Sequence, residues 1–402
     1  MRVDVMGSGP RVVLVHGSVG FGPRAWEAQR PLAERYTLVV VTRSGYPPDR
    51  PGARIDFEDQ AEEVAGLLED GDHLVGHSYG GVVSLLAAAL GPSLRSLTVA
   101  EPPAFALARG NEAVERFLDM VLSAPRDPRG YLETFLPAAG STIPIPDPLP
   151  EALEAGARAA IAERPPNEAE IPLEALASTL FPKLVVSGAH HAAFDAVCDV
   201  LVRELAAERA VAPGAGHSLP RAPGFNDVLE EFLARSRVRF PIETDRMLLR
   251  PFRPGDAEAL HEVWSDPAAR RFGGDWPTPR TLADTRRYLE PMLAGQRERG
   301  YASWAVLERG SGRLIGDCGV FPEDGRGPEL ELAYGLAPDV WGRGYATEAA
   351  AACLQVAFGD LGAAQVVADV DPANAPSIRV LEKIGFEPAG EKGGKLLYVA
   401  RR

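Results

Sequence analysis

The sequence predicts two domains in tandem: an α/β domain built on a mostly parallel sheet, then a smaller mixed α+β domain. Three observations support this. Short apolar runs alternate with helical stretches over residues 1–236, which is typical of parallel strands joined by helices. A long insertion at about residues 104–181 separates two of these runs. From residue 241 a new pattern begins, with several strands in succession and helices before and after them.

Six apolar runs are the expected strands of the first domain, at 11–17, 36–44, 72–78, 96–103, 183–188 and 208–214. The helix at 82–90 is the clearest of those that follow a strand. The insertion at 104–181 holds amphipathic helical pieces around a proline-rich stretch. It is too long for a plain loop, so we expect a small helical cap over one edge of the sheet. A helix at 226–237 then gives way to a proline and a fresh apolar strand, which favours a domain boundary near 236–242.

The composition argues against several classes of function. With 42 basic and 56 acidic residues the net charge is −14, so the sequence lacks the basic character of proteins that bind nucleic acid or anionic membranes. No apolar run reaches the roughly 18–20 residues that span a bilayer, and the first residues lack the pattern of a signal peptide. The three cysteines form no CxxC pair, which fits a reducing compartment. We therefore expect a cytoplasmic protein; the sequence does not predict its oligomeric state.

The segment HLVGHSYGG places Gly76-His77-Ser78-Tyr79-Gly80 between an expected strand and an expected helix. This is G-x-S-x-G in the setting that a nucleophilic serine requires, because the glycines let the chain turn sharply and leave the hydroxyl exposed at the helix start. The N–H of Tyr79 is one expected oxyanion donor, and the N–H of Ser18, in the loop after the first strand, is the other. The alternative is a phosphate-binding glycine turn. The central serine and a matching downstream histidine, His217, disfavour it.

His217 lies in the segment APGAGHS after the last expected strand, where it can serve as the base for Ser78. In these residues and their order, about 235 residues of the chain resemble the α/β-hydrolase superfamily. The resemblance implies an α/β-hydrolase fold, a serine nucleophile, an acyl-enzyme or related mechanism, and a small substrate of the ester or amide type.

The sequence leaves open which acidic residue orients His217. Relatives usually carry an aspartate just after the fifth expected strand, but His191 stands there, and a histidine cannot supply the negative charge. Glu101, at the end of the fourth expected strand, is the favoured substitute. Asp195 is the second candidate, with helix capping as its simpler role; a weak hydrolase without any acid is the third possibility. His77 is expected to pack. The adjacent His190 and His191 lack further ligands at metal-binding spacing, so no metal site is expected.

The strongest signal in the second domain is a glycine turn in front of a helix. A strand at 330–335 leads through a proline-containing turn into Gly342-Arg343-Gly344-Tyr345-Ala346, and an alanine-rich helix follows up to Gly359. Glycines before a helix free successive N–H groups to approach an anion, and the helix dipole favours negative charge, so a pyrophosphate is the expected occupant. A P-loop is excluded because no G-K-[ST] follows, and the spacing differs from the G-x-G-x-x-G of dinucleotide-binding folds.

Further along come a strand, Asn374, Ser377, a short helix and a Gly-Phe turn. Together, W-G-x-G-Y-A-T-E-A and N-x-x-S-x-x-V-L-E-K-x-G-F resemble the GNAT superfamily over about residues 240–402, nearest the branch that acetylates protein N-terminal amines and small amines. The resemblance implies a GNAT fold with a splayed central sheet, acetyl-CoA as co-substrate, and a small-molecule or peptide amine as acceptor. The residues expected to bind acetyl-CoA are Leu336, Trp341, Gly342, Arg343, Gly344, Tyr345, Ala346, Thr347 and Asn374.

Acetyl transfer needs a base for the amine and a proton donor for the departing thiolate. Glu331, on the strand before the glycine turn, is the expected base, acting through water; a solvated strand carboxylate is its simpler interpretation. Many relatives use a tyrosine as the donor, but Leu381 occupies its place. Ser377 is the substitute that the resemblance implies, with capping of the short helix as its structural alternative. The tryptophans that could shape an acceptor pocket are expected mainly to pack in the core: Trp264, Trp276 and Trp304.

Three functions are compatible with these signals. The favoured one is a bifunctional enzyme, a serine hydrolase joined to an acetyl-CoA-dependent N-acetyltransferase. The second has an active acetyltransferase only, with the hydrolase-like domain serving as a catalytically weak substrate-binding or scaffolding module; the histidine at position 191 is its main support. The third is a regulatory or sensing protein with two weak sites, and the intact serine and glycine turns argue against it.

Overall fold

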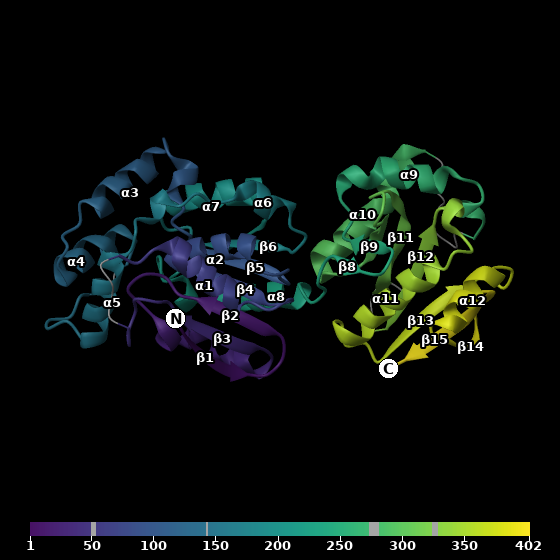
Figure 1. Cartoon of the computed structure of the whole chain (residues 1–402), viewed down its shortest axis with the longest axis horizontal. Helices are drawn as coiled ribbons and strands as arrows, with labels where there is room; N and C mark the ends of the chain where they lie inside the picture. Colours follow the sequence, from purple (N-terminus) through teal and green to yellow (C-terminus); the bar gives the residue numbers. More distant parts are fainter. Residues whose placement is uncertain (50–53, 142–143, 273–280, 324–328) are drawn as a thin grey trace. The chain divides into compact units, whose positions relative to one another are not determined.

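The computed structural model describes residues 1–49, 54–141, 144–272, 281–323 and 329–402. Contacts divide the chain into two compact units, Met1–Leu233 and Ala234–Arg402 (Figure 1). This division falls close to the boundary expected near 236–242. Trp276, considered above for an acceptor pocket, lies outside the described residues.

The first unit contains a seven-stranded sheet in the order β1-β3-β2-β4-β5-β6-β7. All neighbouring strands are parallel except β1, which runs antiparallel to β3. The strands are β1 (Arg2–Gly7), β2 (Arg11–Val15), β3 (Thr37–Thr42), β4 (His73–His77), β5 (Ser96–Ala100), β6 (Lys183–Ser187) and β7 (Glu208–Val211). The helices that cover this sheet include η2 (Glu27–Glu34), α1 (Phe57–Leu67), α2 (Tyr79–Leu90), α7 (Ala192–Leu205) and α8 (Phe225–Arg235).

The strands of this sheet direct alternate side chains to opposite faces, and both faces are covered. Val13 and Val15 of β2 belong to one buried cluster together with residues of α1, α2 and α7. Val12 and Leu14 belong to a second cluster with residues of η2 and α8 on the other face. Burial on both faces explains why the parallel strands appear in the sequence as continuous apolar runs.

Strand β1 is missing from the sequence prediction. It lies at the edge of the sheet, and among the described strands it pairs with β3 alone. Its two valines, Val3 and Val5, alternate with polar residues, and Val5 is 62% exposed. A short, half-exposed edge strand carries too few apolar residues to give a clear signal.

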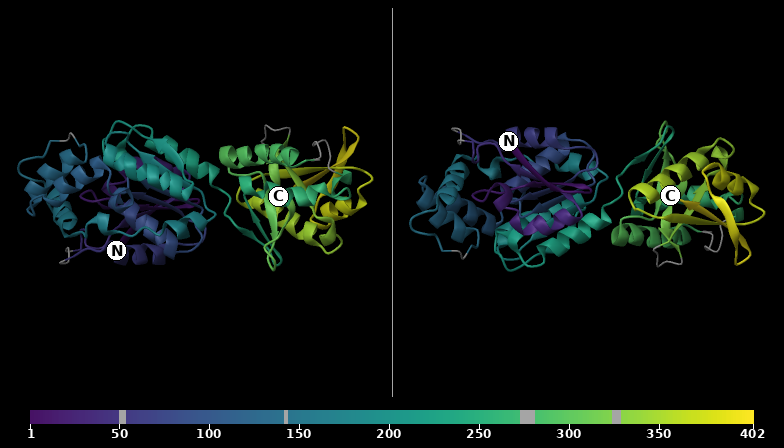
Figure 2. Two further views of the ribbon diagram at one scale, coloured as in Figure 1. Left: turned by 90° about the horizontal axis from the view of Figure 1, so that it is seen from above. Right: turned by 90° about the horizontal axis from the view of Figure 1, so that it is seen from below.

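The segment between β5 and β6 forms the helical cap. Asn111 and Asp127 begin two of its helices by accepting hydrogen bonds from first-turn N–H groups, which is the ordinary role of such residues at a helix start. Three of the helices, α3, α4 and α5, lie together beside the sheet (Figures 1 and 2). The segment comprises η3 (Phe105–Ala108), α3 (Glu112–Leu122), α4 (Pro128–Ala138), α5 (Glu151–Ala162), η4 (Pro166–Glu168) and α6 (Leu173–Ser178).

The second unit contains an eight-stranded sheet in the order β14-β15-β13-β12-β11-β10-β9-β8. Its strands are β8 (Ile242–Glu243), β9 (Met247–Arg250), β10 (Ser303–Glu308), β11 (Leu314–Pro322), β12 (Leu330–Leu336), β13 (Gln365–Val370), β14 (Glu387–Lys392) and β15 (Lys395–Arg401). Its main helices are α9 (Ala257–Ser265), α10 (Leu282–Arg299), α11 (Tyr345–Gly359) and α12 (Ala375–Lys383).

The parallel strands β12 and β13 pair only at their beginnings. The two paired positions are Leu330 with Val366 and Glu331 with Val367. Beyond them β12 continues to Leu336 and β13 to Val370 without further ladder pairs between the two strands. The predicted splay of the central sheet is therefore confirmed.

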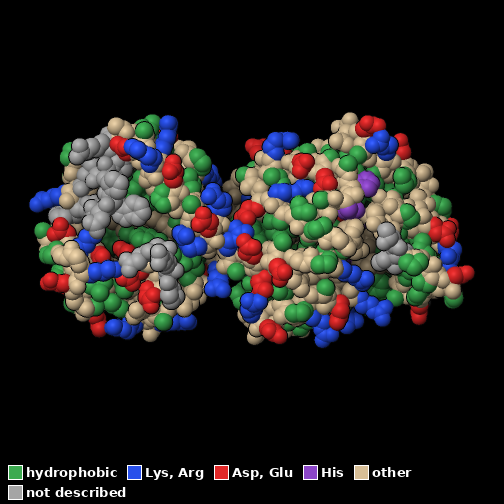
Figure 3. Space-filling model, turned by 180° about the vertical axis from the view of Figure 1, so that it is seen from behind, with side chains coloured by type: hydrophobic (Ala, Val, Ile, Leu, Met, Phe, Trp, Pro, Cys, Tyr) green, Lys and Arg blue, Asp and Glu red, His purple; other side chains and the backbone are tan. Residues whose placement is uncertain are grey.

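Charged side chains of both signs are interspersed over the face of the molecule seen in Figure 3. Among the described residues, every helix is too short or too polar to cross a lipid bilayer.

Candidate active sites

Ser78 lies at the sharp turn between β4 and α2, with φ 52° and ψ −127°. A non-glycine residue rarely adopts such angles, and when it does the strain is commonly found at functional sites. The glycines on either side make the turn possible: a Cβ at Gly80 would overlap the carbonyl oxygens of Val15 and His16. The serine is thus held at the end of β4 and at the start of α2, as the G-x-S-x-G pattern predicts.

A chain of two hydrogen bonds links Ser78 to His217 and Glu101. The Oγ of Ser78 lies 2.7 Å from Nε2 of His217, and Nδ1 of His217 lies 2.7 Å from Oε2 of Glu101. Since a carboxylate can only accept, Nδ1 carries the proton, and Nε2 accepts from the serine hydroxyl. The ring of Phe194 stacks on that of His217 with centroids 4.2 Å apart, which fixes the plane of the imidazole.

Glu101 follows β5 directly, with φ 43°, and its side chain is 1% exposed. Burial raises the pKa of its carboxyl group, but contacts with His190 and His217 and a hydrogen bond from the Gly188 N–H (2.7 Å) outweigh this and hold the pKa at about 2. The carboxylate is therefore ionised at neutral pH and can stabilise a positive charge on His217.

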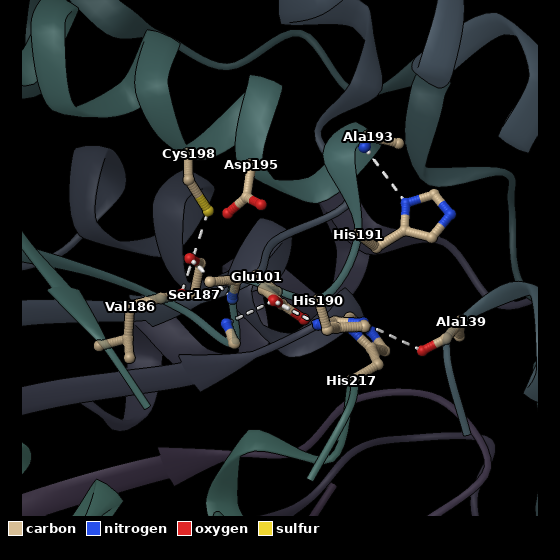
Figure 4. Close-up of polar contacts among 12 residues, drawn as sticks. Glu101, Ala139, Val186, Ser187, His190, His191, Ala193, Asp195, Cys198 and His217 are labelled. Atoms are coloured by element: carbon tan, nitrogen blue, oxygen red, sulfur yellow. Dashed lines mark hydrogen bonds and ion pairs between the residues drawn. The ribbon is translucent and has the colours of Figure 1, made fainter. Parts of the chain in front are cut away.

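The other residues considered for the acid lie elsewhere. His191 caps α7 by accepting a hydrogen bond from the Ala193 N–H at 3.2 Å (Figure 4). Asp195 lies in the first turn of the same helix and pairs with Arg209 at 2.9 Å. The structure therefore places Glu101, rather than either of these, against His217.

The loop that carries Ser18 passes directly beside Ser78, since a Cβ at Gly17 would lie 2.7 Å from the Cβ of Ser78. The Oγ of Ser18 donates to Glu163 at 2.5 Å, and the guanidinium of Arg43 donates to Glu163 at 2.6 Å and to the Gly17 carbonyl at 2.8 Å.

The same Arg43 guanidinium lies 4.6 Å from the ring centroid of Tyr79. The buried ion pair thus contacts both segments that carry the expected oxyanion donors. The sequence analysis missed it, because Arg43 and Glu163 are 120 residues apart.

Replacing Glu163 by alanine is expected to destabilise the first unit by about 3–5 kcal/mol, because Arg43, whose side chain is 0% exposed, would remain buried without its partner. Hydrogen exchange of the amides in β2 and β4 measures the stability of this unit alone. Glu112→Ala is the matched control, since Glu112 pairs with Arg116 on the surface and its loss should change stability little. Equal losses of stability in the two variants would contradict a stabilising role for the buried Arg43–Glu163 ion pair.

His77, expected only to pack, also contacts the loop that carries His217. Its Nε2 lies 2.6 Å from the carbonyl oxygen of His217, and burial lowers its pKa to about 3, so the neutral ring donates this hydrogen bond. Within the described ranges, Glu101, His190 and His217 have ligand atoms within 4.8 Å of one another, close enough to hold a metal ion. Both nitrogens of His217 are already used by Ser78 and Glu101, so this arrangement favours a hydrogen-bonded chain.

In the second unit, the glycine turn precedes α11 as predicted. Gly342 and Gly344 have φ of 70° and 84°, a conformation that glycine adopts without strain. No side chain among the described residues caps the helix. The N–H groups of Tyr345, Ala346 and Thr347 fall in its first turn, where N–H groups lack partners within the helix and the dipole favours an anion. This turn fits a pyrophosphate.

Arginines surround this turn. The guanidinium of Arg246 lies 4.4 Å from the ring centroid of Tyr345 and donates to the Arg343 carbonyl at 2.8 Å; that of Arg343 lies 5.3 Å from the same ring. Tyr345 itself is buried, and its hydroxyl donates to Glu308 at 3.0 Å, so only its main chain is available to a ligand. The indole N–H of Trp341 donates to the Leu336 carbonyl at 2.8 Å and so ties the turn to the end of β12.

Glu331 lies at the last position where β12 pairs with β13, and there the two central strands begin to separate. Burial and the negative charge of Asp369 raise the pKa of its carboxyl group to about 7, against the opposing charge of Lys395. A carboxylate with this pKa can take up a proton near neutral pH, as a general base must.

Asn374 caps α12 by accepting from the Ser377 N–H at 3.3 Å, so the capping role considered for Ser377 is wrong. The hydroxyl of Ser377 instead forms a 2.7 Å hydrogen bond with that of Tyr334, which lies on β12. Sequence reasoning missed Tyr334, because it considered tyrosines only after the Asn motif. Leu381, at that position, is buried.

The two described tryptophans considered for an acceptor pocket are core residues. Trp304 is fully buried, and its indole N–H donates to Gln296 at 3.0 Å. Trp264 is 8% exposed, and its ring fills the space beside Gly335, where a Cβ would overlap it.

Relatives of the second unit are acetyltransferases. A family model for the acetyltransferase (GNAT) domain matches residues 246–387. The uncharacterized N-acetyltransferase p20 of Bacillus licheniformis is 30% identical over 148 residues, which cover 37% of this chain and 82% of that protein.

Relatives of the first unit are hydrolases. A family model for the alpha/beta hydrolase family matches residues 12–228. A pimeloyl-[acyl-carrier protein] methyl ester esterase of Aeromonas hydrophila is 38% identical over 110 residues, 26% of this chain but only 43% of that esterase. The crystal structure of an α/β hydrolase from Sphaerobacter thermophilus matches 58% of this chain and 95% of its own at 26% identity, with a TM-score of 0.42. The chain therefore belongs to the α/β hydrolase family through residues 12–228 and to the GNAT acetyltransferases through residues 246–387.

Proposed function

We propose that the chain is a bifunctional enzyme, in which the first unit is a serine hydrolase of small carboxylic esters or amides and the second transfers an acetyl group from acetyl-CoA to an amine. The observation that supports the hydrolase most directly is the hydrogen-bonded chain from Ser78 through His217 to Glu101. The uncapped glycine turn before α11 and the splayed strands β12 and β13 support the transferase.

In the proposed hydrolysis, the Ser78 oxygen attacks the substrate carbonyl while Nε2 of His217 takes its proton. Glu101 stabilises the imidazolium, and the N–H groups of Ser18 and Tyr79 stabilise the oxyanion. His217 then returns the proton to the leaving alcohol or amine, and water releases the acyl group from Ser78 by the same steps in reverse order. The likeness to a methyl ester esterase makes carboxylic esters the first substrates to test.

In the proposed acetyl transfer, the chain binds the CoA pyrophosphate at Gly342, Gly344 and the first turn of α11, with Arg343 adding positive charge. Glu331 accepts the proton of the attacking amine through water. Ser377, hydrogen-bonded to Tyr334, donates a proton to the departing thiolate. No metal is needed for either reaction as proposed.

One preparation tests both activities. A fluorophosphonate probe reports a reactive serine, and release of free CoA from acetyl-CoA is measured with and without amines: N-terminal peptides, polyamines, aminoglycosides and amino acids. Serine labelling together with amine-dependent CoA release is the expected result. Amine-dependent release without labelling would instead favour an acetyltransferase whose hydrolase-like unit is a binding or scaffolding module. CoA release that needs no amine would indicate thioester hydrolysis by the first unit.

Replacing Glu331 by glutamine is expected to lower kcat for acetyl transfer about 10²- to 10⁴-fold, the usual contribution of a general base. The wild-type rate should rise as pH increases through about 7, because Glu331 must lose its proton to act, and this rise should vanish in the variant. The acceptor's own ionisation is common to both proteins and cancels in the ratio of rates. Glu329→Gln, an exposed carboxylate next to β12, should behave as wild type; a variant Glu331→Gln that does so too would exclude this base.

A further inference from the structure

Glu101 is shared by two histidines, of which only His217 has a place in the proposed reaction. Nδ1 of His190 lies 3.2 Å from Oε1 of Glu101, the carboxylate oxygen that also accepts from the Gly188 N–H. The other oxygen, Oε2, faces His217. The loop after β6 therefore supplies two contacts to the carboxylate of Glu101, at the end of β5.

The His190 ring bridges this carboxylate to the cap. Its Nε2 lies 3.2 Å from the carbonyl oxygen of Ala139, the residue that ends α4 (Figure 4). Both ring nitrogens thus face acceptors. A neutral imidazole has a single N–H, whereas an imidazolium carries a positive charge that pairs with the Glu101 carboxylate at Nδ1, without an aligned hydrogen bond, and donates to the Ala139 carbonyl through Nε2. The carbonyl end of a helix also favours a positive charge.

The surroundings of His190 are built to hold this ring. A Cβ at Gly140 would overlap it, and a Cβ at Gly188 would lie 2.9 Å from its Nδ1. Phe194 stacks nearly parallel to it, with centroids 6.1 Å apart. Gly140 in the cap and Gly188 after β6 therefore leave room for this ring, and a larger residue at either position would collide with it.

The two carboxylates near His190 favour its protonated form. Glu101 at the end of β5 and Asp195 on α7 are acidic, and contact with Glu101, the larger influence, raises the pKa of His190 against partial burial. His217, whose ring centroid is 6.4 Å away, and the adjacent His191 are the other titratable groups facing it.

We propose that His190 is a positioning residue of the hydrolase site: as an imidazolium it holds Oε1 of Glu101, leaves Oε2 for His217, and fastens the end of α4 in the cap to the catalytic carboxylate. This rests on the proposed hydrolase function. Loss of one proton from His190 leaves a nitrogen lone pair facing either Glu101 or the Ala139 carbonyl. The bridge then breaks, and the link between the cap and the site is lost at alkaline pH.

The test is the rate of serine labelling by a fluorophosphonate as a function of pH, in the wild type and in His190→Gln. We expect the wild-type rate to fall again at alkaline pH. We expect the variant to label about 10- to 100-fold more slowly at neutral pH, a loss of the size found when residues that orient metal ligands are replaced. It should also lack the alkaline fall.

Two further variants separate this role from packing. His190→Phe fills the same slot without donors and should behave as His190→Gln; a wild-type profile in it would overturn the proposal. His191→Gln changes the adjacent histidine, which caps α7, and should leave the profile unchanged. Labelling in the wild type with an unaltered profile in His190→Gln would overturn the role of His190 alone. Absence of labelling in the wild type would overturn the hydrolase itself, and with it this role.

The protonation of His190 can also be read without activity. Histidine ¹⁵N spectra of the whole chain, with the His190 signal assigned from His190→Gln, should show both ring nitrogens protonated at pH 6. They should also show a lower pKa for this ring in Glu101→Gln. A ring with one bare nitrogen at pH 6 would contradict the bridge.

Discussion

Replacing Ser78 by alanine is expected to lower kcat for ester hydrolysis by about 10⁶-fold, the loss seen when the nucleophile of a serine hydrolase triad is removed. The reason is that, in the proposed mechanism, Ser78 forms the covalent bond to the acyl group, and among the described residues its hydroxyl alone is hydrogen-bonded to Nε2 of His217. A residual rate about 10³- to 10⁴-fold above that in water should persist if the oxyanion donors remain in place. Acetyl transfer should be unchanged.

Labelling and amine-dependent CoA release in the same samples measure both outcomes. Ser123→Ala is the matched control: that serine ends α3, its hydroxyl donates to the Met120 carbonyl, and its loss should leave labelling intact. Labelling that survives in Ser78→Ala would exclude Ser78 as the nucleophile. The bifunctional proposal assumes that the two units act independently. A fall in acetyl transfer together with hydrolysis would contradict that assumption.

Much of the fold could be predicted from the sequence, because buried parallel strands and glycine turns leave strong local signals. The five inner strands of the first unit, β2 to β6, are largely apolar runs, and α11 ends at Gly359, as predicted. Strand β1 could not be predicted with the same rules, since its stability comes from pairing with β3 and not from apolar residues of its own.

The candidate sites divide in the same way. Ser78 and the Gly342–Gly344 turn could be predicted from local sequence, because the expected chemistry requires a particular backbone shape at each of them. The partners of these residues depend on contacts between distant segments. Glu101 could be named as a candidate, but the choice between it and Asp195 rests on which carboxylate the fold brings to His217. The bridge through His190 needs a glycine in the cap and another after β6, and no local pattern predicts such a meeting.

Glu101→Gln is the second substitution for which a very large effect is expected, a fall of about 10⁴-fold in kcat for ester hydrolysis. An amide carries no charge to stabilise the imidazolium, and its NH₂ group can turn toward Nδ1 of His217 and favour the wrong tautomer. Because the pKa of Glu101 is about 2, the wild-type carboxylate stays ionised at every pH at which the protein is assayed. A loss of activity on mild acidification therefore does not come from protonation of Glu101.

Asp195→Asn separates the two acids. Asp195 is 32% exposed and paired with Arg209, so its loss removes a partly exposed ion pair and should leave hydrolysis nearly unchanged. The opposite pattern, a large loss in Asp195→Asn and a small one in Glu101→Gln, would make Asp195 the acid. Small losses of hydrolysis in both variants would mean that the site works without an acidic residue.

Stability serves as a check that the loss in Glu101→Gln is catalytic. The pKa of Glu101 lies below its unfolded value, so its carboxylate stabilises the fold above about pH 4.5, and that contribution disappears as pH falls through 2. The variant should therefore be less stable than wild type at pH 7, with a difference that shrinks as the solution is acidified. Ester hydrolysis is therefore compared at pH 7 and at a temperature where both proteins remain folded. If only the wild type hydrolyses ester there, the lost rate comes from the missing charge beside His217 and not from unfolding.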